Sequence, residues 1–145
     1  MKPFSLETVL NYRQRLEDIA HNRFFEAEKN RTIIEKKLAH ELKLLDKLIK
    51  TSSALQAKGI TITELIRYEN IILKNEENIL AIRKTLAEKE VLAEKERENL
   101  IRRSRDRQIL EGLKDHQNLA WKAYLNKKEA AMLDEIAIIR YDNEK

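Results

Sequence analysis

The sequence predicts an all-α fold: an antiparallel two-helix coiled coil, or long α-hairpin, with a C-terminal helical overhang. The chain holds only two glycines and one proline in 145 residues, so almost nothing in it breaks a helix. Charged residues make up 37% of the composition and hydrophobic residues 42%, a bias typical of long helices and coiled coils. Only Gly59 lies in a segment with both a helix stop and a helix start. We therefore expect one domain, residues 1–145, folded as a single hairpin.

The first helix is predicted over about residues 5–57. Ser5 is a favourable N-cap, and Phe4 and Val9 have the spacing of a hydrophobic staple, which fixes how the chain enters a helix. Apolar residues then recur at intervals of three and four, so they form one stripe along the helix, interrupted by polar groups around Arg31. The stripe consists of Leu6, Leu10, Leu16, Ile19, Phe24, Ile34, Leu38, Leu42, Leu45, Leu48 and Leu55.

The turn is predicted at about residues 58–61 and carries the sharpest local signal. Gly59 suits the left-handed position that follows the end of many helices. Thr61 and Glu64 have the spacing of a capping box, in which each side chain bonds the other residue's backbone N–H group. Because the stop and the start adjoin, we expect the second helix over about residues 62–140.

The second helix carries an apolar stripe that weakens after its first third. This stripe consists of Leu65, Tyr68, Ile72, Ile79, Ile82 and Leu86. Farther along, Lys89, Arg103 and Arg107 fall at positions that the same spacing assigns to the seam between the helices. Long basic side chains can extend out of such a seam, so this half is predicted to pair loosely or to accept a third protein.

The second helix is predicted to outrun the first. Antiparallel pairing about Gly59 matches position i with roughly 119 − i, and at about 1.5 Å per residue the paired part is roughly 80 Å long. The first helix then starts opposite Lys114, and about 30 residues overhang. Exposed apolar side chains on a helix indicate a surface that binds another protein. We therefore expect an external partner for this overhang, and folding back onto the same chain is the alternative. The apolar residues of the overhang are Leu119, Trp121, Tyr124, Leu125, Met132, Leu133, Ile136, Ile138 and Ile139.

Composition also limits the classes of function. The chain has no cysteine, so disulfides and thiol chemistry are excluded. The first residues lack the apolar core of a signal peptide, and no apolar run approaches the roughly 20 residues of a membrane span. We therefore expect a soluble cytoplasmic protein. The pI near 9.2 arises from interleaved charges of both signs, which is the usual surface of a solvated helix.

No residue pattern in the chain predicts an active site. Phosphate-loop, dinucleotide-binding and zinc-protease motifs are missing, and His21, His40 and His116 lie far apart in the sequence. Glutamates alternate with lysines and arginines, which indicates ion pairing along helices rather than acid–base catalysis. We expect no enzyme activity, no catalytic residue, no metal, no cofactor and no small-molecule substrate.

A basic cluster consists of Arg102, Arg103, Arg105 and Arg107. A solvated patch is the favoured interpretation, and a binding patch for an acidic protein is the second. A nucleic-acid site is the third, because no aromatic residues for base stacking are interleaved with the arginines. We expect no nucleic-acid partner.

Three segments resemble the FliJ family of flagellar export proteins. Residues 4–13 (Phe-Ser-Leu-Glu-Thr-Val-Leu-Asn-Tyr-Arg) resemble the family's start. Lys127 and Lys128, followed by residues 133–137 (Leu-Asp-Glu-Ile-Ala), resemble its C-terminal signature. Between them, residues 59–68, with Gly-Ile at the turn and Ile-x-Tyr at the end, resemble its hairpin turn and the start of its second helix. The order and spacing of the three segments carry the resemblance.

The resemblance implies a cytoplasmic component of the flagellar type III export apparatus, peripherally associated with the inner membrane. Its hairpin is similar to the central stalk, the gamma subunit, of rotary ATPases. Three partners are implied. They are the hexameric export ATPase, whose ring the stalk enters and helps to assemble, the cytoplasmic domain of the export-gate membrane protein, and the export chaperones.

The resemblance also implies two groups of contact residues. The ATPase would be bound at the end that bears the termini, by Leu6, Tyr12, Arg13, Leu133, Asp134 and Glu135. The gate would be bound by the middle and upper hairpin, through Leu44, Leu48, Tyr68, Ile71 and Asn75. Relatives can carry tyrosine at the two leucine positions and leucine at the asparagine position. For every residue in both groups, an internal seam or a solvent-facing position is the alternative.

Two other functions remain open. One is the equivalent stalk of a virulence type III secretion system. The other is a generic coiled-coil scaffold or dimerising adaptor, which predicts a stable homodimer through the C-terminal overhang.

Overall fold

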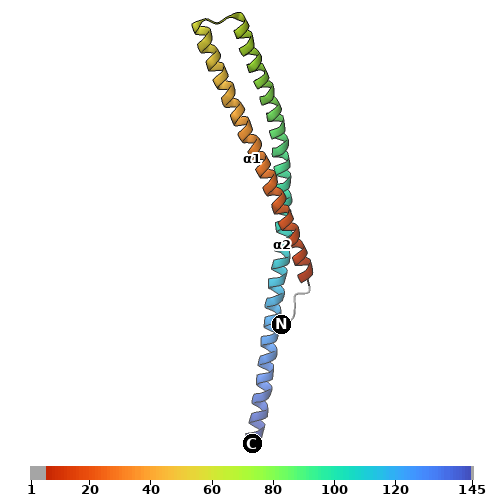
Figure 1. Ribbon diagram of the computed structural model, residues 1–145. Coiled ribbons are helices and arrows are strands. Elements are labelled where there is room, and N and C mark those ends of the chain that lie inside the picture. The colour runs from red at the N-terminus through yellow and green to blue at the C-terminus, as the bar shows by residue number, and fades with distance from the viewer. Residues whose placement is uncertain (1–5, 145) are drawn as a thin grey trace. The chain divides into compact units, whose positions relative to one another are not determined.

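A computed structural model describes residues 6–144 of the chain. Helix α1 spans Glu7–Lys58 and helix α2 spans Ile62–Glu144, and a short turn joins them (Figure 1). No strand occurs within the described residues. The predicted fold class, an all-α helical hairpin, is confirmed. The predicted N-cap at Ser5 and the staple residue Phe4 lie outside the described residues.

The turn forms as its residues predict. Gly59 has a φ of 90°, a left-handed conformation that costs a residue with a side chain about 1–2 kcal/mol, and its N–H donates to the carbonyl of Gln56 at 3.2 Å. The N–H of Glu64 donates to Thr61 Oγ1 at 3.2 Å, which is one of the two bonds of a capping box. Helix α2 therefore begins immediately after the turn.

The packed residues fall into two compact units. The turn unit is Ala20–Leu100, and the terminal unit combines Met1–Ile19 with Ile101–Lys145. Each helix contributes one segment to each unit, so each unit holds an antiparallel pair of helical segments. The two units are described separately below.

In the turn unit, small side chains take much of the seam. Ala20, Ala27 and Ala93 are buried together with Ile79 and Ile82. The predicted stripe had correctly included the two isoleucines but no alanine. Alanine side chains let two helix backbones approach closely, and a large side chain at the same place would hold them apart. The apolar spacing of a sequence therefore misses such positions.

The predicted interruption of the seam near Arg31 is also present in the turn unit. The Arg31 guanidinium donates to Glu28 at 2.7 Å and to Glu35 one turn along. Both carboxylates lie on the same helix as the arginine. The charge is thus neutralised within α1 at the point where the apolar stripe is broken.

In the terminal unit, Leu10 and Leu110 are both buried and form an apolar cluster. Arg13 pairs with Asp106 at 3.4 Å, the partner that the predicted register assigns to it. Glu7, the first residue of α1, pairs with Lys114 at 3.1 Å. Helix α1 therefore starts opposite Lys114, as the register predicts, and α2 continues beyond that level (Figure 1).

Candidate functional site

Surfaces, rather than an enclosed pocket, are the candidate sites of this chain. Within residues 6–144, no three His, Cys, Asp or Glu side chains gather in the arrangement of a metal site. None of the helices there is apolar over a length that would cross a bilayer. The predicted absence of a cofactor, a metal and an enzyme activity stays a prediction.

The five residues of the predicted gate group all lie in the turn unit. Leu44 and Leu48 lie on α1, and Tyr68, Ile71 and Asn75 lie on α2. Leu44 and Ile71 are exposed, whereas Leu48 and Tyr68 are half-buried. The antiparallel register places the two leucines opposite the stretch from Ile71 to Asn75. The structure therefore brings this group to one level of the turn unit.

Asn75 differs from the rest of the gate group, because its side chain is in the seam and only 5% exposed. Its Nδ2 donates to Glu41 Oε2 of α1 at 2.8 Å. Within the described residues, no donor reaches its Oδ1. A buried polar atom of this kind costs free energy, and a polar seam position fixes register in coiled coils. Asn75 is thus placed to set the pairing of α1 with α2, and its contact with the gate stays a prediction.

A shallow hollow extends the gate group along the outer surface of α2. Ile71 contributes to its lining together with Ile66, and both side chains are about half exposed. The remaining lining residues are Thr63, Arg67, Asn70 and Lys74. Apolar centres bordered by basic side chains make this hollow suited to an acidic, partly apolar protein surface.

The six residues of the predicted ATPase group lie in the terminal unit, in two separate places. Leu6 and Tyr12 are exposed near the start of α1, and Arg13 is held by Asp106. Residues 133–135 are exposed on α2, 19 residues beyond Lys114, where α1 begins. At about 1.5 Å per residue, this separates the two sets by roughly 28 Å along the helix. The structure does not bring them together.

A charged cluster in the terminal unit was missed by sequence reasoning. Arg107 donates to Glu17 of α1 at 2.6 Å and to Glu111 of α2 at 2.6 Å. Only about a fifth of the Arg107 and Glu17 side chains is exposed. From the sequence, we expected long basic side chains such as Arg107 to extend out of the seam. Arg107 instead stays in the seam, where the two carboxylates balance its charge. Glu111, one turn along α2, was the available signal. Glu17 was not, because the predicted register places position 12 opposite Arg107.

The basic cluster is divided by this arrangement. Arg107 is held in the seam and Arg103 is half-buried, whereas Arg102 and Arg105 are exposed. At about 100° per residue, the four side chains do not share one face of α2. A single four-arginine patch is therefore not formed.

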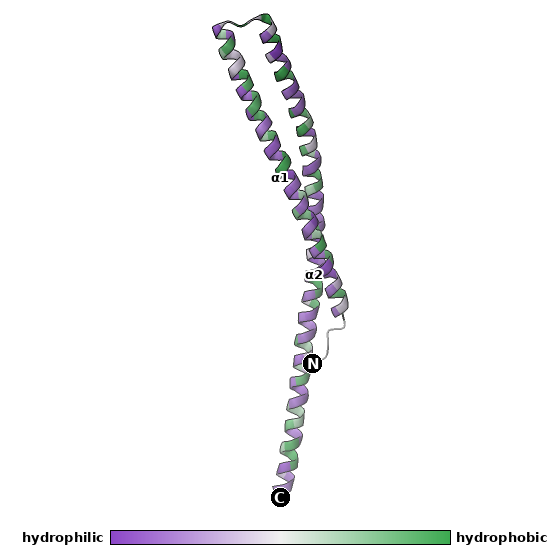
Figure 2. Cartoon of the chain, viewed as in Figure 1, coloured by the Kyte–Doolittle hydropathy of each residue, from purple (hydrophilic) through white to green (hydrophobic). Residues whose placement is uncertain are grey.

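An open surface with recurring apolar residues lies on α2 beyond Lys114. All but three of the residues from 115 to 144 are exposed, and hydrophobic residues recur among them (Figure 2). The rings of Trp121 and Tyr124 stack, with centroids 5.3 Å apart. This segment, residues 115–144, is called the C-terminal extension below.

In a comparison with protein families, the model described as the flagellar FliJ protein matches residues 1–145. Comparisons with curated proteins and with solved structures gave no match. The family match spans both candidate surfaces.

Proposed function

Because the chain belongs to the flagellar FliJ family, it is a component of the flagellar export apparatus, and we propose that it acts there as a non-enzymatic stalk. In this proposal it enters the hexameric export ATPase, promotes assembly and activity of the ring, and connects the ring to the export gate and to export chaperones. The family match favours flagellar export over a virulence secretion system. The proposed location is the cytoplasmic side of the inner membrane, by peripheral association.

One observation carries the stalk proposal: the C-terminal extension is a continuous helix whose apolar residues are open. The axial hole of a hexameric ring accepts a helix or a pair of helices, not a globule. Exposed apolar area of this extent on a helix marks a protein-binding surface. In the proposal, residues 133–135 contact the ATPase from α2, and Leu6, Tyr12 and Arg13 contact it from α1 at a separate level.

The gate is proposed to bind the turn unit. Leu44 and Ile71 supply exposed apolar contacts, and the half-buried Leu48 and Tyr68 support them from the seam. Asn75 contributes by holding Glu41, which keeps the two helices in register beneath this surface. Export chaperones are proposed to use the same unit, because its basic-edged hollow suits acidic proteins.

The proposal is tested by turnover of the export ATPase under hexamer-forming conditions, with and without this protein. We expect the full chain to raise turnover and a chain ending at Lys128 to lose the effect. Leu133→Ala and Glu135→Lys are expected to weaken activation. Val91→Ala is the matched control, since Val91 is an exposed apolar residue of the turn unit.

Two results would contradict the proposal. If the full chain neither binds the ATPase nor changes its turnover, the stalk function is wrong. If the chain ending at Lys128 activates as well as the full chain, the C-terminal extension is not the ATPase contact. Binding of the isolated gate domain, lost on Leu44→Asp or Ile71→Asp, tests the second surface separately.

A further inference from the structure

The C-terminal extension carries an apolar stripe that continues the seam of the terminal unit. Leu110 and Lys114 contact α1 through Leu10 and Glu7. At about 100° per residue, both lie within roughly 40° of Met132 around the axis of α2. The same band of the helix surface contains Trp121, Leu125, Met132, Ile136 and Ile139.

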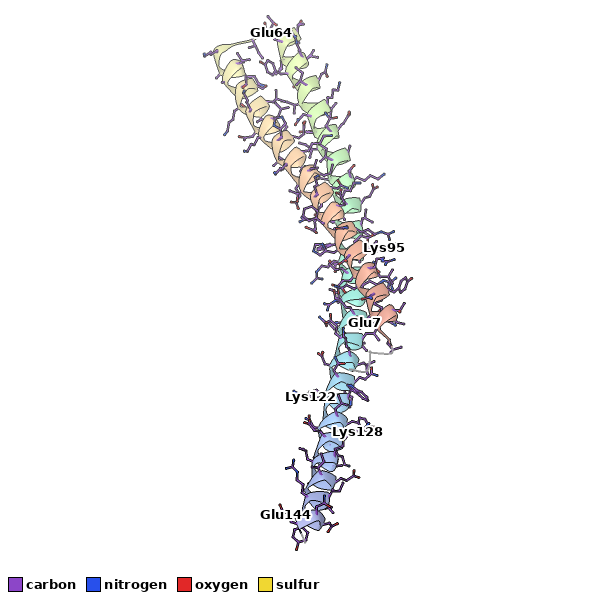
Figure 3. All side chains as sticks on the ribbon, turned by 60° about the horizontal axis from the view of Figure 1, so that its bottom comes forward. Glu7, Glu64, Lys95, Lys122, Lys128 and Glu144 are labelled. Atoms are coloured by element: carbon purple, nitrogen blue, oxygen red, sulfur yellow. The ribbon has the colours of Figure 1, made fainter. Side chains whose placement is uncertain are left out.

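Within the described residues of the terminal unit, no helix covers this stripe. Figures 1 and 3 show that the part of α2 bearing Lys122, Lys128 and Glu144 runs on past Glu7 with no second helix beside it. Met132 is 56% exposed and Ile139 is 58% exposed. The apolar stripe of a helix normally faces a packing partner, so the bare stretch is open to another helix.

We propose that a second copy of this chain covers the stripe, with the two C-terminal extensions antiparallel and centred on Met132. In this arrangement Met132 faces Met132 of the second copy, and Leu125 faces Ile139 of the second copy. The interface is then isologous, which is the commonest symmetry of protein dimers. Because Glu135 takes part in both this interface and the proposed ATPase contact, one copy cannot make both contacts at once.

The position at which α1 begins fits this arrangement. With the two-fold axis at Met132, residue 120 of one copy lies level with residue 144 of the other. Glu144 of the second copy therefore lies six residues beyond Lys114, the level at which Glu7 pairs. Helix α1 occupies the seam up to that level, and the second copy occupies it from there onward.

The charges beside the stripe favour this register. Lys128 and Glu135 lie on the same flank, roughly 40° and 60° from Met132. They lie four residues before and three residues after the two-fold axis. Each Lys128 therefore meets Glu135 of the second copy, which gives two ion pairs. Lys122 and Arg140 lie on the opposite flank and face each other between the copies as like charges. Reversing one of them is therefore expected to tighten the dimer.

Sedimentation equilibrium of the purified full chain tests the proposal. We expect a concentration-dependent dimer, and a monomer for Met132→Asp at every concentration. Lys128→Glu and Glu135→Lys each replace two attractive pairs by repulsive ones and are expected to weaken dimerisation about tenfold. The double exchange of these two residues is expected to restore it. Arg140→Glu is expected to strengthen it, and Val91→Asp, in the turn unit, to leave it unchanged.

The orientation is tested by disulfide cross-linking, since the chain has no cysteine of its own. Met132→Cys is expected to cross-link to itself under oxidising conditions. Leu125→Cys is expected to cross-link only when mixed with Ile139→Cys. Circular dichroism of every variant checks that the hairpin is retained, which we expect because these side chains lie outside the α1–α2 seam.

Three outcomes would overturn the proposal. A wild-type chain that stays monomeric at all concentrations would leave the stripe to the ATPase or another protein. Self-cross-linking of Leu125→Cys alone would indicate a parallel pair. A dimer that Met132→Asp does not weaken would place the contact elsewhere on the chain.

Discussion

Arg107 occupies a seam position at which the apolar spacing predicts a hydrophobic side chain. Two neighbouring glutamates form hydrogen bonds with it, which explains how a charged side chain fits there. The guanidinium bonds Glu17 across the seam and Glu111 along α2. These hydrogen bonds, the one to Glu17 first, raise the pKa of Arg107 above its ordinary value. Arginine is charged at every pH at which the protein is handled, and because its pKa is raised in the folded state, the stabilising effect is lost only in strong alkali.

Arg107→Ala leaves two part-buried carboxylates without their cation. We expect it to lower the free energy of unfolding by about 1 kcal/mol, equal at pH 7 and pH 9, measured as a melting-temperature shift by circular dichroism. Arg97→Ala is the control, since the exposed Arg97–Glu94 pair is worth at most about 0.5 kcal/mol. Equal shifts for both variants would show that the Arg107 cluster contributes nothing beyond a surface pair.

The two glycines have opposite roles at the scale of the helix. Gly59 ends α1 with a φ of 90°, and Gly112 lies inside α2 with an ordinary helical φ. An added Cβ would meet no atom within 4 Å at either position. Backbone conformation alone therefore decides the effect of alanine at each.

Gly59→Ala is expected to destabilise the hairpin by about 1 kcal/mol, because alanine disfavours a left-handed φ. Gly112→Ala is expected to stabilise it by about 0.5–1 kcal/mol, because alanine is the better helix former. Thermal melts of the two variants measure this directly. Destabilisation by both would mean that Gly112 has a packing role that the structure does not contain.

The helix elements were more predictable than the contacts between them. The turn at Gly59, the start of α2 and the partner of Arg13 follow from local signals and from counting residues away from one break. The length and direction of each side chain decide which polar groups meet across the seam. The spacing of apolar residues in the sequence does not show these contacts. The Asn75–Glu41 bond and the burial of Ala20 next to an exposed Ile19 are of this kind. The apolar spacing predicted that Ile19 lies in the seam, but the smaller Ala20 is buried there because it lets the two helices pack closely.

At the scale of the whole molecule, the two units differ in connectivity. The turn unit, Ala20–Leu100, is one continuous piece of chain that includes the turn, whereas the terminal unit is made of two pieces from opposite ends. Contacts near a turn close short loops and form early, and contacts between chain ends close the longest loop. The turn unit is therefore able to fold without the terminal unit, but not the reverse.

A chain of residues 20–100 is accordingly expected to be helical and to melt cooperatively, because it retains Gly59, the Asn75–Glu41 bond and the buried Ile79, Ile82 and Ala93. Residues 101–145 alone are expected to be largely unfolded in dilute solution, because an isolated helix without its packing partner is marginal in water. Circular dichroism against temperature measures both. A non-cooperative melt of residues 20–100 would contradict this division and would mean that the hairpin is stable only when its two ends are clamped together.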